Sequence, residues 1–327
     1  MVEKKQERGS TLNLYPTWDV HIHSVETVVR HILPSAPTRI ERMLEGGSTY
    51  VYRIIFPQET FYLRILPEVG ASFAPEAAVH SRLRQLAVKV PEVIYVEPYN
   101  ELLQRSIMVT TEIQGQPLTQ SQSLSQEELQ GILQEAGRDL ARLNSLPVKG
   151  FGWITRDRPT LSLEAQWATL RLFLLEFWNA DLAFLAKNTL SSMEIVQLER
   201  VVTYYDAWLD SEQGYLAHGD MDISHIYQEN GRYTGIIDFG EIRGASSWYD
   251  LGHFHMRDCE TLPVQLEPYL VDGYREITPL PEDYEQHIRF TSLLINVRIL
   301  ARSLQKRPAN RYTRHQLEVL RKDVAFL

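Results

Sequence analysis

The chain of 327 residues contains a single cysteine, Cys259, so it cannot form an internal disulfide. The lack of disulfides is typical of a reducing compartment, and we expect a cytoplasmic protein. No run of about 18 or more apolar residues occurs, so no membrane-spanning helix is predicted. The first eight residues are charged and no apolar stretch follows them, so no signal peptide is expected.

Positive charge is also scarce. The chain has 33 Lys and Arg against 42 Asp and Glu, a net charge of -9, which argues against general nucleic-acid binding. Residues 201–300 alone hold 6 basic and 17 acidic side chains, whereas residues 301–327 are basic. An acidic cleft in the second half would concentrate a cationic ligand. The alternative is an acidic surface that only maintains solubility.

The pattern of apolar residues predicts two regions of different character. The length corresponds to roughly two domains. An N-terminal lobe, residues 1–115 with 1–23 as a lead-in, is predicted to form a small antiparallel sheet with one long helix. A helical lobe, residues 116–327, is predicted to follow, opening with a capping box of Ser125 and Glu128. Within these lobes we predict helices over 24–33, 75–86, 166–185, 193–209, 281–304 and 313–325, strands over 39–66, 93–96 and 106–111, and a strand-and-loop insert over 215–240.

Two carboxylates in this insert form the strongest chemical signal. Asp220 and Asp238 each follow an apolar, strand-like run, and a hairpin would bring them to one end of a small sheet. Phosphoryl transfer uses such a pair. One carboxylate orients and deprotonates a hydroxyl group, and the other holds Mg²⁺ against the phosphates.

The insert resembles the aminoglycoside phosphotransferase family, whose signature is His-Gly-Asp, four residues, Asn, and then Ile-Asp-Phe/Trp-Gly. The chain reads His218-Gly-Asp-Met-Asp-Ile-Ser-His-Ile226, then Ile236-Ile-Asp-Phe-Gly240 and Asp250-Leu251. Upstream segments agree in order, namely a turn at 45–53, a strand at 61–65, a helix acid at Glu76 and a hinge at 108–115. Gly150-Phe-Gly152 and Trp167 resemble the hygromycin branch more weakly. The resemblance implies an α+β, protein-kinase-like fold of two lobes and ATP- or GTP-dependent phosphorylation of a small-molecule hydroxyl.

The resemblance also implies residue roles. Asp220 would be the catalytic base and Asp238 a Mg²⁺ ligand, while His218 and Asp250 would support the catalytic loop. Arg64 would contact the nucleotide phosphates and pair with Glu76. The remaining nucleotide contacts would come from a turn, whose backbone N–H groups cover the phosphates, and from a hinge, whose backbone holds the purine. These residues are Gly46, Gly47, Ser48 and Thr49 in the turn, and Thr111, Glu112 and Ile113 in the hinge.

Two positions depart from the family pattern. His225 stands where the family has an Asn metal ligand, and imidazole is a poorer ligand than oxygen for Mg²⁺. We therefore predict that Asp238 is the main ligand, that His225 is the second, and that Mn²⁺ supports activity at least comparably. Arg64 replaces the usual Lys, and its always-charged, forked guanidinium can bind phosphate. Some relatives share each of these departures.

The acceptor is less determined than the reaction. An aminoglycoside is the leading acceptor, because the acidic second half suits a polycation. A role in antibiotic resistance and a role in ordinary metabolism both stay open. Asp222, Asp258 and Glu260 are candidate acceptor contacts, although each has the alternative of a plain acid without such a role, and Asp222 could instead bind a second metal ion. Macrolides, homoserine, choline, methylthioribose and other sugars stay open as acceptors. A nucleotide-binding pseudokinase also stays open, because of His225. We expect a monomer or homodimer.

Three other features have plainer interpretations. Asp19-Val-His-Ile-His23 resembles the opening of metal-dependent amidohydrolases if both His share one face of a strand, but those enzymes need eight βα repeats. His253 and His255 fall in a predicted helix, where they point apart, so a packing or substrate-rim role is expected. Cys259 is expected to be an ordinary thiol, buried or half-buried.

Overall fold

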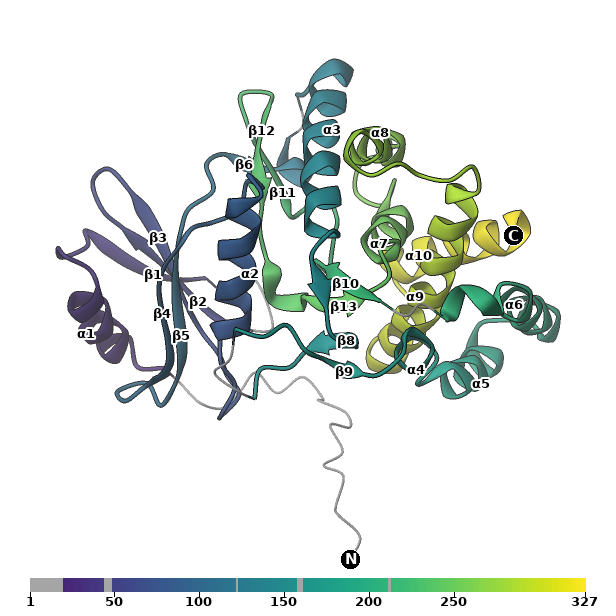
Figure 1. The fold of residues 1–327 in the computed structure, drawn as a ribbon, viewed down its shortest axis with the longest axis horizontal. Helices are drawn as coiled ribbons and strands as arrows, with labels where there is room; N and C mark the ends of the chain where they lie inside the picture. The colour runs from purple at the N-terminus through teal and green to yellow at the C-terminus, as the bar shows by residue number, and fades with distance from the viewer. Residues whose placement is uncertain (1–19, 44–48, 122, 158–160, 211–212) are drawn as a thin grey trace, which may run out of the picture.

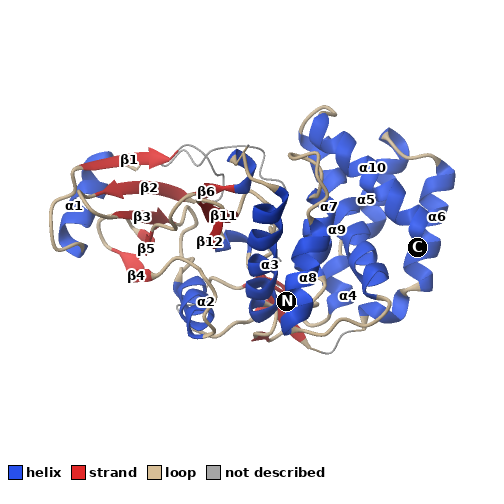
Figure 2. Ribbon diagram, turned by 90° about the horizontal axis from the view of Figure 1, so that it is seen from above, coloured by secondary structure: helices blue, strands red, loops and turns tan. Residues whose placement is uncertain are grey.

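The structure is a computed structural model that describes residues 20–43, 49–121, 123–157, 161–210 and 213–327. The chain folds into two lobes, one built mainly on a sheet and the other mainly on helices (Figures 1 and 2). The sheet of the N-terminal lobe has the antiparallel order β1-β2-β3-β5-β4. The elements of this lobe are α1 (Ile22–Ile32), β1 (Arg39–Met43), β2 (Tyr50–Ile55), β3 (Thr60–Ile65), α2 (Ala74–Gln85), β4 (Val93–Asn100) and β5 (Arg105–Thr111).

Alternation of side chains gives this sheet two faces. Tyr52 and Leu63 lie on one face and pack with the apolar side of α1. Arg64 lies on the other face, in register with Met108, and Met108 packs against Ala77 of α2. The two helices therefore cover opposite faces, and α2 stands between the sheet and the second lobe (Figure 1). Arg64 is thus directed toward the junction of the lobes.

The C-terminal lobe combines two small sheets with a layer of helices. Its five-stranded sheet has the order β7-β10-β13-β8-β9, and a three-stranded sheet has the order β12-β11-β6. The strands are β6 (Gln116–Pro117), β7 (Pro147–Val148), β8 (Phe151–Ile154), β9 (Ala165–Trp167), β10 (Gly214–Ala217), β11 (Ile226–Glu229), β12 (Arg232–Ile236) and β13 (Arg243–Ala245). The helices are α3 (Gln126–Leu143), α4 (Leu170–Leu174), α5 (Trp178–Asn188), α6 (Ser192–Tyr204), α7 (Tyr249–Arg257), α8 (Glu267–Ile277), α9 (Tyr284–Lys306) and α10 (Arg311–Phe326). None of the described helices is both long and apolar enough to cross a membrane.

The largest core cluster runs through both lobes. It contains Val79 and Leu83 of α2 from the N-terminal lobe. From the C-terminal lobe it contains Leu140 of α3, Leu270 of α8, and Phe239, which follows Asp238. Burial of these side chains is the main favourable term that holds the lobes together. The loops that carry Asp220 and Asp238 lie against this shared core, so their positions depend on both lobes.

Most predicted elements are present with shifted ends. The capping box predicted at Ser125 and Glu128 is confirmed, since each residue caps the other at the start of α3. The helix predicted over 166–185 is wrong, because residues 165–167 form β9 and the helical residues divide into α4 and α5. Pairing of β9 with β8 is a long-range contact that local periodicity does not show.

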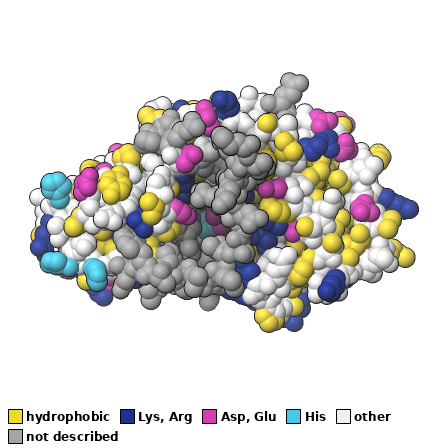
Figure 3. Space-filling view, turned by 90° about the horizontal axis from the view of Figure 1, so that it is seen from below, with side chains coloured by type: hydrophobic (Ala, Val, Ile, Leu, Met, Phe, Trp, Pro, Cys, Tyr) yellow, Lys and Arg dark blue, Asp and Glu magenta, His cyan; other side chains and the backbone are white. Residues whose placement is uncertain are grey.

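The segment with two histidines before α1 is not a strand. His21 is the N-cap of α1 and His23 lies in its first turn, and both side chains are exposed. Asp19 lies outside the described residues. Histidine side chains gather at the end of the molecule where α1 lies (Figure 3). The two-lobe fold has no barrel of repeated βα units among its described elements, so the amidohydrolase interpretation is wrong.

Candidate active site

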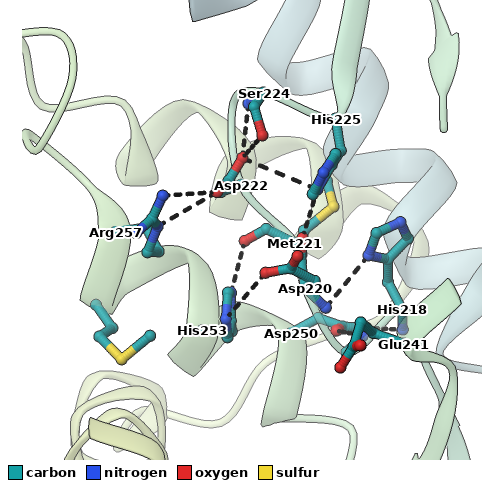
Figure 4. A network of polar contacts seen from close by, with 12 residues as sticks. His218, Asp220, Met221, Asp222, Ser224, His225, Glu241, Asp250, His253 and Arg257 are labelled. Atoms are coloured by element: carbon teal, nitrogen blue, oxygen red, sulfur yellow. Dashed lines mark hydrogen bonds and ion pairs between the residues drawn. The ribbon is translucent and has the colours of Figure 1, made fainter. Parts of the chain in front are cut away.

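The loop that carries Asp220 is anchored by one fully buried carboxylate. Asp250 Oδ2 accepts hydrogen bonds from His218 N and Asn144 Nδ2, both at 2.8 Å, and its Oδ1 accepts from Gly219 N at 2.9 Å. Gly219 has φ +87°, and a Cβ there would lie 2.0 Å from the Glu241 carbonyl oxygen, so only glycine fits. The next residue, Asp220, presents a side chain that is 42% exposed (Figure 4).

His218 connects this loop to the strand that leads to Asp238. Its Nε2 lies 2.8 Å from the Ile237 carbonyl oxygen, to which it donates, and its Nδ1 accepts weakly from Asp220 N at 3.4 Å. One neutral tautomer satisfies both contacts. These contacts fit the supporting roles expected for His218 and Asp250.

Asp238 is held in an unusual backbone conformation. Its φ of 65° and ψ of 64° lie in the left-handed region, and its side chain accepts from Gly240 N at 3.3 Å. The protein that surrounds the carboxylate would by itself raise the pKa of Asp238, but Arg64, and then His225, outweigh it and lower that pKa. The next side chain, Phe239, is buried and packs against the rings of His80 and His218. Asp238 is therefore fixed as an anion opposite Arg64.

His225 contacts the backbone of Asp220 and lies beside the Asp238 carboxylate. Its Nδ1 is 2.7 Å from the Asp220 carbonyl oxygen, which can only accept, so Nδ1 carries a hydrogen. In the neutral ring the lone pair is then on Nε2, which lies 3.7 Å from Asp238 Oδ2. Burial disfavours the charged ring, but Asp222, Asp220 and Asp238 together raise the pKa of His225. A bound cation would compete with that proton.

Three side chains that include His225 form a group that could hold a divalent cation. Asp220, Asp222 and His225 can each place one ligand atom within 4.8 Å of the others. Asp222 is already engaged, because it accepts from Ser224 N at 2.7 Å and pairs with Arg257 Nη2 at 3.1 Å. Burial would raise the pKa of Asp222, but His225 and Arg257 lower it. Among the described residues, Asp220 and His225 of this group could hold a cation, and Asp238 Oδ2, which lies 3.7 Å from His225 Nε2, offers a further oxygen.

The N-terminal lobe contributes Arg64 and Glu76. The expected ion pair between them is present, and the Glu76 side chain is fully buried. A second guanidinium, which the sequence did not indicate, also contacts Glu76: Arg156 Nη2 lies 3.1 Å from Oε2. The same nitrogen donates to the Gly240 carbonyl oxygen at 2.9 Å. Both lobes therefore meet at Glu76.

The predicted hinge has one backbone donor to spare. Thr111 N donates to the Glu92 carbonyl oxygen at 2.9 Å, and Glu112 N donates to Thr60 O at 3.2 Å. Ile113 N makes no hydrogen bond to any residue that the structure describes. Of the three hinge residues, Ile113 is therefore the one whose N–H could bind a purine.

The rest of the predicted nucleotide site is only partly described. Glu112 Oε1 accepts from Tyr62 OH and Arg53 Nη2, each at 3.1 Å. Burial, followed by Glu112, raises the pKa of Tyr62 to about 12. Thr49 is described and half-buried beside β2. Gly46, Gly47 and Ser48, predicted to cover the phosphates, lie outside the described residues.

Asp258 and Glu260, two candidate acceptor contacts, are engaged within the lobe. Asp258 accepts from Glu267 N and Leu266 N, with oxygen–nitrogen distances of 3.0 Å, and so caps the start of α8. Glu260 pairs with Arg257 Nη1 at 2.7 Å. The same guanidinium also pairs with Asp222. Cys259, expected to be buried or half-buried, is exposed, so that prediction is wrong. Acceptor binding by Asp258 and Glu260 stays a prediction.

Two further side chains face Asp220 and were not singled out as site residues. His253 Nδ1 donates to the Met221 carbonyl oxygen at 3.1 Å, and its Nε2 lies 3.5 Å from Asp220 Oδ1. Burial raises the pKa of Glu241, and Asp220 is among the neighbours that raise it further. The sequence contained one signal for the position of His253. Residues three apart in a helix share a face, and Asp250, which was expected to support the loop, lies three residues before His253.

The comparisons with known proteins agree with this arrangement. The family model for the phosphotransferase enzyme family, APH, matches residues 39–287, more than half of the chain. No curated protein matches the chain. Similar solved structures include a thermostable mutant of the aminoglycoside phosphotransferase APH(4)-Ia in ternary complex with ADP and hygromycin B. Its TM-score is 0.67 at 17% identity, covering 92% of this chain and 98% of that chain.

Two more structures give the same picture. A related mutant of APH(4)-Ia with AMP-PNP and hygromycin B has a TM-score of 0.66 at 17% identity, covering 92% of this chain and 98% of that chain. The GDP and kanamycin complex of APH(2″)-IIIa has a TM-score of 0.62 at 18% identity, covering 94% and 99%. At these identities the likeness shows the fold, and the family match shows membership. The chain belongs to the phosphotransferase enzyme family and is a phosphotransferase with a protein-kinase-like, two-lobe α+β fold.

Proposed function

We propose that the protein transfers the γ-phosphoryl group of ATP or GTP to a hydroxyl group of a small molecule, with an aminoglycoside as the leading acceptor. The observation that supports this most is the meeting of three groups at the junction of the lobes. Asp220 is half-exposed on an anchored loop, and Asp238 and Arg64 lie close enough that Arg64 lowers the pKa of Asp238. The similar structures hold AMP-PNP, ADP or GDP together with hygromycin B or kanamycin, which adds support.

In this proposal Asp220 accepts a hydrogen bond from the acceptor hydroxyl and takes its proton as the oxygen attacks phosphorus. Its loop is held by the buried Asp250, so the base is positioned before the acceptor arrives. Arg64 stabilises negative charge on the phosphates. A Mg²⁺ or Mn²⁺ ion held by Asp238 and His225 would supply further charge neutralisation there when bound.

A cationic acceptor fits the charges around Asp220. Burial, and then Asp220 and Asp238, raise the pKa of Glu241, although Arg243 Nη2 pairs with this carboxylate at 3.0 Å and lowers that pKa, so negative charge gathers near the Asp220 side chain. Ammonium groups on the acceptor would relieve this mutual repulsion. This is the reason to test amino sugars before neutral sugars.

The experiment is coupled ADP and GDP release, with Mg²⁺, across aminoglycosides, macrolides, small amino alcohols and sugars. We expect turnover with one acceptor class. The Asp220→Asn variant should lower kcat by roughly 10² to 10⁴-fold, the usual contribution of a general base, and should still bind nucleotide. Comparable turnover by this variant would contradict the assignment of Asp220.

Two other results would point elsewhere. Nucleotide binding without turnover on any acceptor would favour the pseudokinase interpretation, and the His225→Asn variant then tests whether the metal site is the cause. Absence of nucleotide binding by the parent chain would contradict the proposed function itself.

A further inference from the structure

Glu76 is contacted by two cations, although one would offset its charge. Arg64 reaches Oε1 from β3, and Arg156 Nη2 lies 3.1 Å from Oε2. The Glu76 side chain has no solvent exposure, and the two arginine side chains are 12% and 21% exposed. A buried carboxylate needs one counter-charge to compensate for lost water. The second guanidinium therefore means that Glu76 keeps a counter-charge if Arg64 turns to another anion.

The two arginines come from different lobes. Arg64 belongs to the sheet, whereas Arg156 follows β8 in the C-terminal lobe. The Arg156 carbonyl oxygen accepts from Ser72 N at 2.7 Å, just before α2. Its Nη2 donates to the carbonyl oxygen of Gly240, two residues after Asp238, at 2.9 Å. Arg156 is thus held by contacts to the N-terminal lobe and to the loop that carries the proposed metal ligand.

We propose that Arg156 is a positioning residue that neutralises Glu76 from the C-terminal lobe and so leaves the Arg64 guanidinium free to bind nucleotide phosphate. This inference rests on the proposed function. Without Arg156, Arg64 would be the only cation on Glu76 among the described residues, and its movement to phosphate would leave a buried carboxylate uncompensated. The resulting loss of binding free energy would be larger for nucleotides with more phosphates in contact with Arg64.

The test is a series of nucleotides that differ only in phosphate number. The full chain and its Arg156→Met variant are titrated with adenosine, ADP and AMP-PNP by calorimetry, or with the guanine series if the parent prefers it. Met keeps much of the apolar stem and removes the charge. We expect adenosine affinity to change little, AMP-PNP affinity to fall roughly tenfold, the scale of a charged hydrogen bond, and ADP to fall in between.

Two further variants separate positioning from general damage. Arg156→Lys keeps the charge and should restore most of the AMP-PNP affinity. In a Glu76→Gln background, Arg156→Met should have little further effect on AMP-PNP, because no carboxylate remains to be neutralised. Lys149→Met is the matched control, since Lys149 is an 81% exposed cation near β8 that pairs with Glu164 and not with Glu76.

Three results would overturn the inference. These are an equal loss for adenosine and AMP-PNP, an unchanged AMP-PNP affinity, or a full loss that persists in the Glu76→Gln background. If Arg156→Met does not fold, Arg156→Gln, which also removes the charge while Glu76 is present, carries the same comparison. Failure of the parent chain to bind any of the nucleotides would overturn the proposed function and this inference with it. A parent that binds, with variants that match it, would overturn the inference alone.

Discussion

At the scale of single residues, Asp250 shows how one buried carboxylate organises a loop. Its two oxygens accept from the backbone of His218 and Gly219 and from the Asn144 amide, and solvent does not reach it. A carboxylate that accepts several N–H groups supplies their missing hydrogen bonds inside the protein. The position of Asp220 depends on these contacts, because the anchored residues come directly before it.

Replacement of Asp250 by Asn should therefore destabilise the protein. An amide can accept from one side only, and its NH₂ group would face donors, so we expect a loss of roughly 2 to 3 kcal/mol in the free energy of unfolding. Urea unfolding of the two proteins measures this difference. The control is Asp272→Asn on α8, where the residue is exposed and little change is expected. Equal midpoints for Asp250→Asn and the parent would contradict this assignment.

His225 determines the metal preference in our interpretation. Imidazole nitrogen suits Mn²⁺ better than Mg²⁺, so Mn²⁺ should support turnover at least as well as Mg²⁺. The His225→Asn variant should shift the preference toward Mg²⁺, and His225→Ala should lose more activity in Mn²⁺. Initial rates with each ion at saturation provide the comparison. An equal loss in both ions on His225→Ala would count against a ligand role.

At the scale of elements, His255 of α7 connects the helices of the C-terminal lobe. Its Nδ1 lies 2.6 Å from Glu267 Oε2 on α8, and its Nε2 lies 2.9 Å from Asp323 Oδ1 on α10. Asp323 also pairs with Arg289 of α9 at 3.0 Å. Both ring nitrogens face carboxylates and must donate, so the ring is protonated. Burial opposes this charge, but Glu267 and Asp323 outweigh it and raise the pKa of His255 to about 10.

Stability should consequently fall in alkaline solution. A raised pKa in the folded state means that this stabilisation is complete below the unfolded pKa of about 6.5 and is lost as pH rises toward the folded value. We expect a loss of roughly 2 kcal/mol between pH 7 and pH 9 from this group. Urea unfolding across that range measures it. The slope should flatten in His255→Gln and persist in His31→Gln, a change at an exposed histidine of α1. A parent curve that is flat from pH 7 to 9 would refute the role.

At the scale of the whole molecule, the two lobes share one apolar core while their surfaces differ in charge. Residues 201–300, which include the catalytic loop, carry a net charge of -11 in sequence. The helical lobe also exposes apolar side chains, which are visible on the face shown in Figure 3. Leu172, Met193 and Tyr204 are among the exposed apolar residues of this lobe. The segment that carries Asp220 is therefore net negative, and at low ionic strength it would attract a cationic acceptor before contact.

The KM of a cationic acceptor should rise with ionic strength. Added salt shortens the reach of the acidic field, so an increase from 50 to 300 mM NaCl should raise that KM several-fold. A neutral acceptor of the same enzyme, or the nucleotide itself, should show a smaller increase. Steady-state kinetics at both salt concentrations measures the effect. A KM that does not change for a polycationic acceptor would show that long-range charge has no part in its binding.

The sequence alone determined the features that depend on local periodicity and on one compact motif. Alternation of apolar residues predicts β2 and β3, and the capping box predicts the start of α3, because such patterns reflect neighbours along the chain. The motifs around Asp220 and Asp238, through their resemblance to the aminoglycoside phosphotransferase family, likewise predicted a phosphotransferase. Sequence could not show how other acids would be engaged. Asp258 has the same chemistry whether it binds a substrate or caps a helix, and Glu260 whether it binds a substrate or pairs with Arg257.

Only the tertiary structure decided which distant groups meet. Arg156 joins Glu76 across 80 residues, Asn144 joins Asp250 across 106, and His255 joins Asp323 across 68. No local period links such partners, because their contact depends on the angle at which whole helices and lobes pack on the shared core. The motif thus carries the identity of the reaction, while the packing of the lobes sets the charge and rigidity of the site where it would occur.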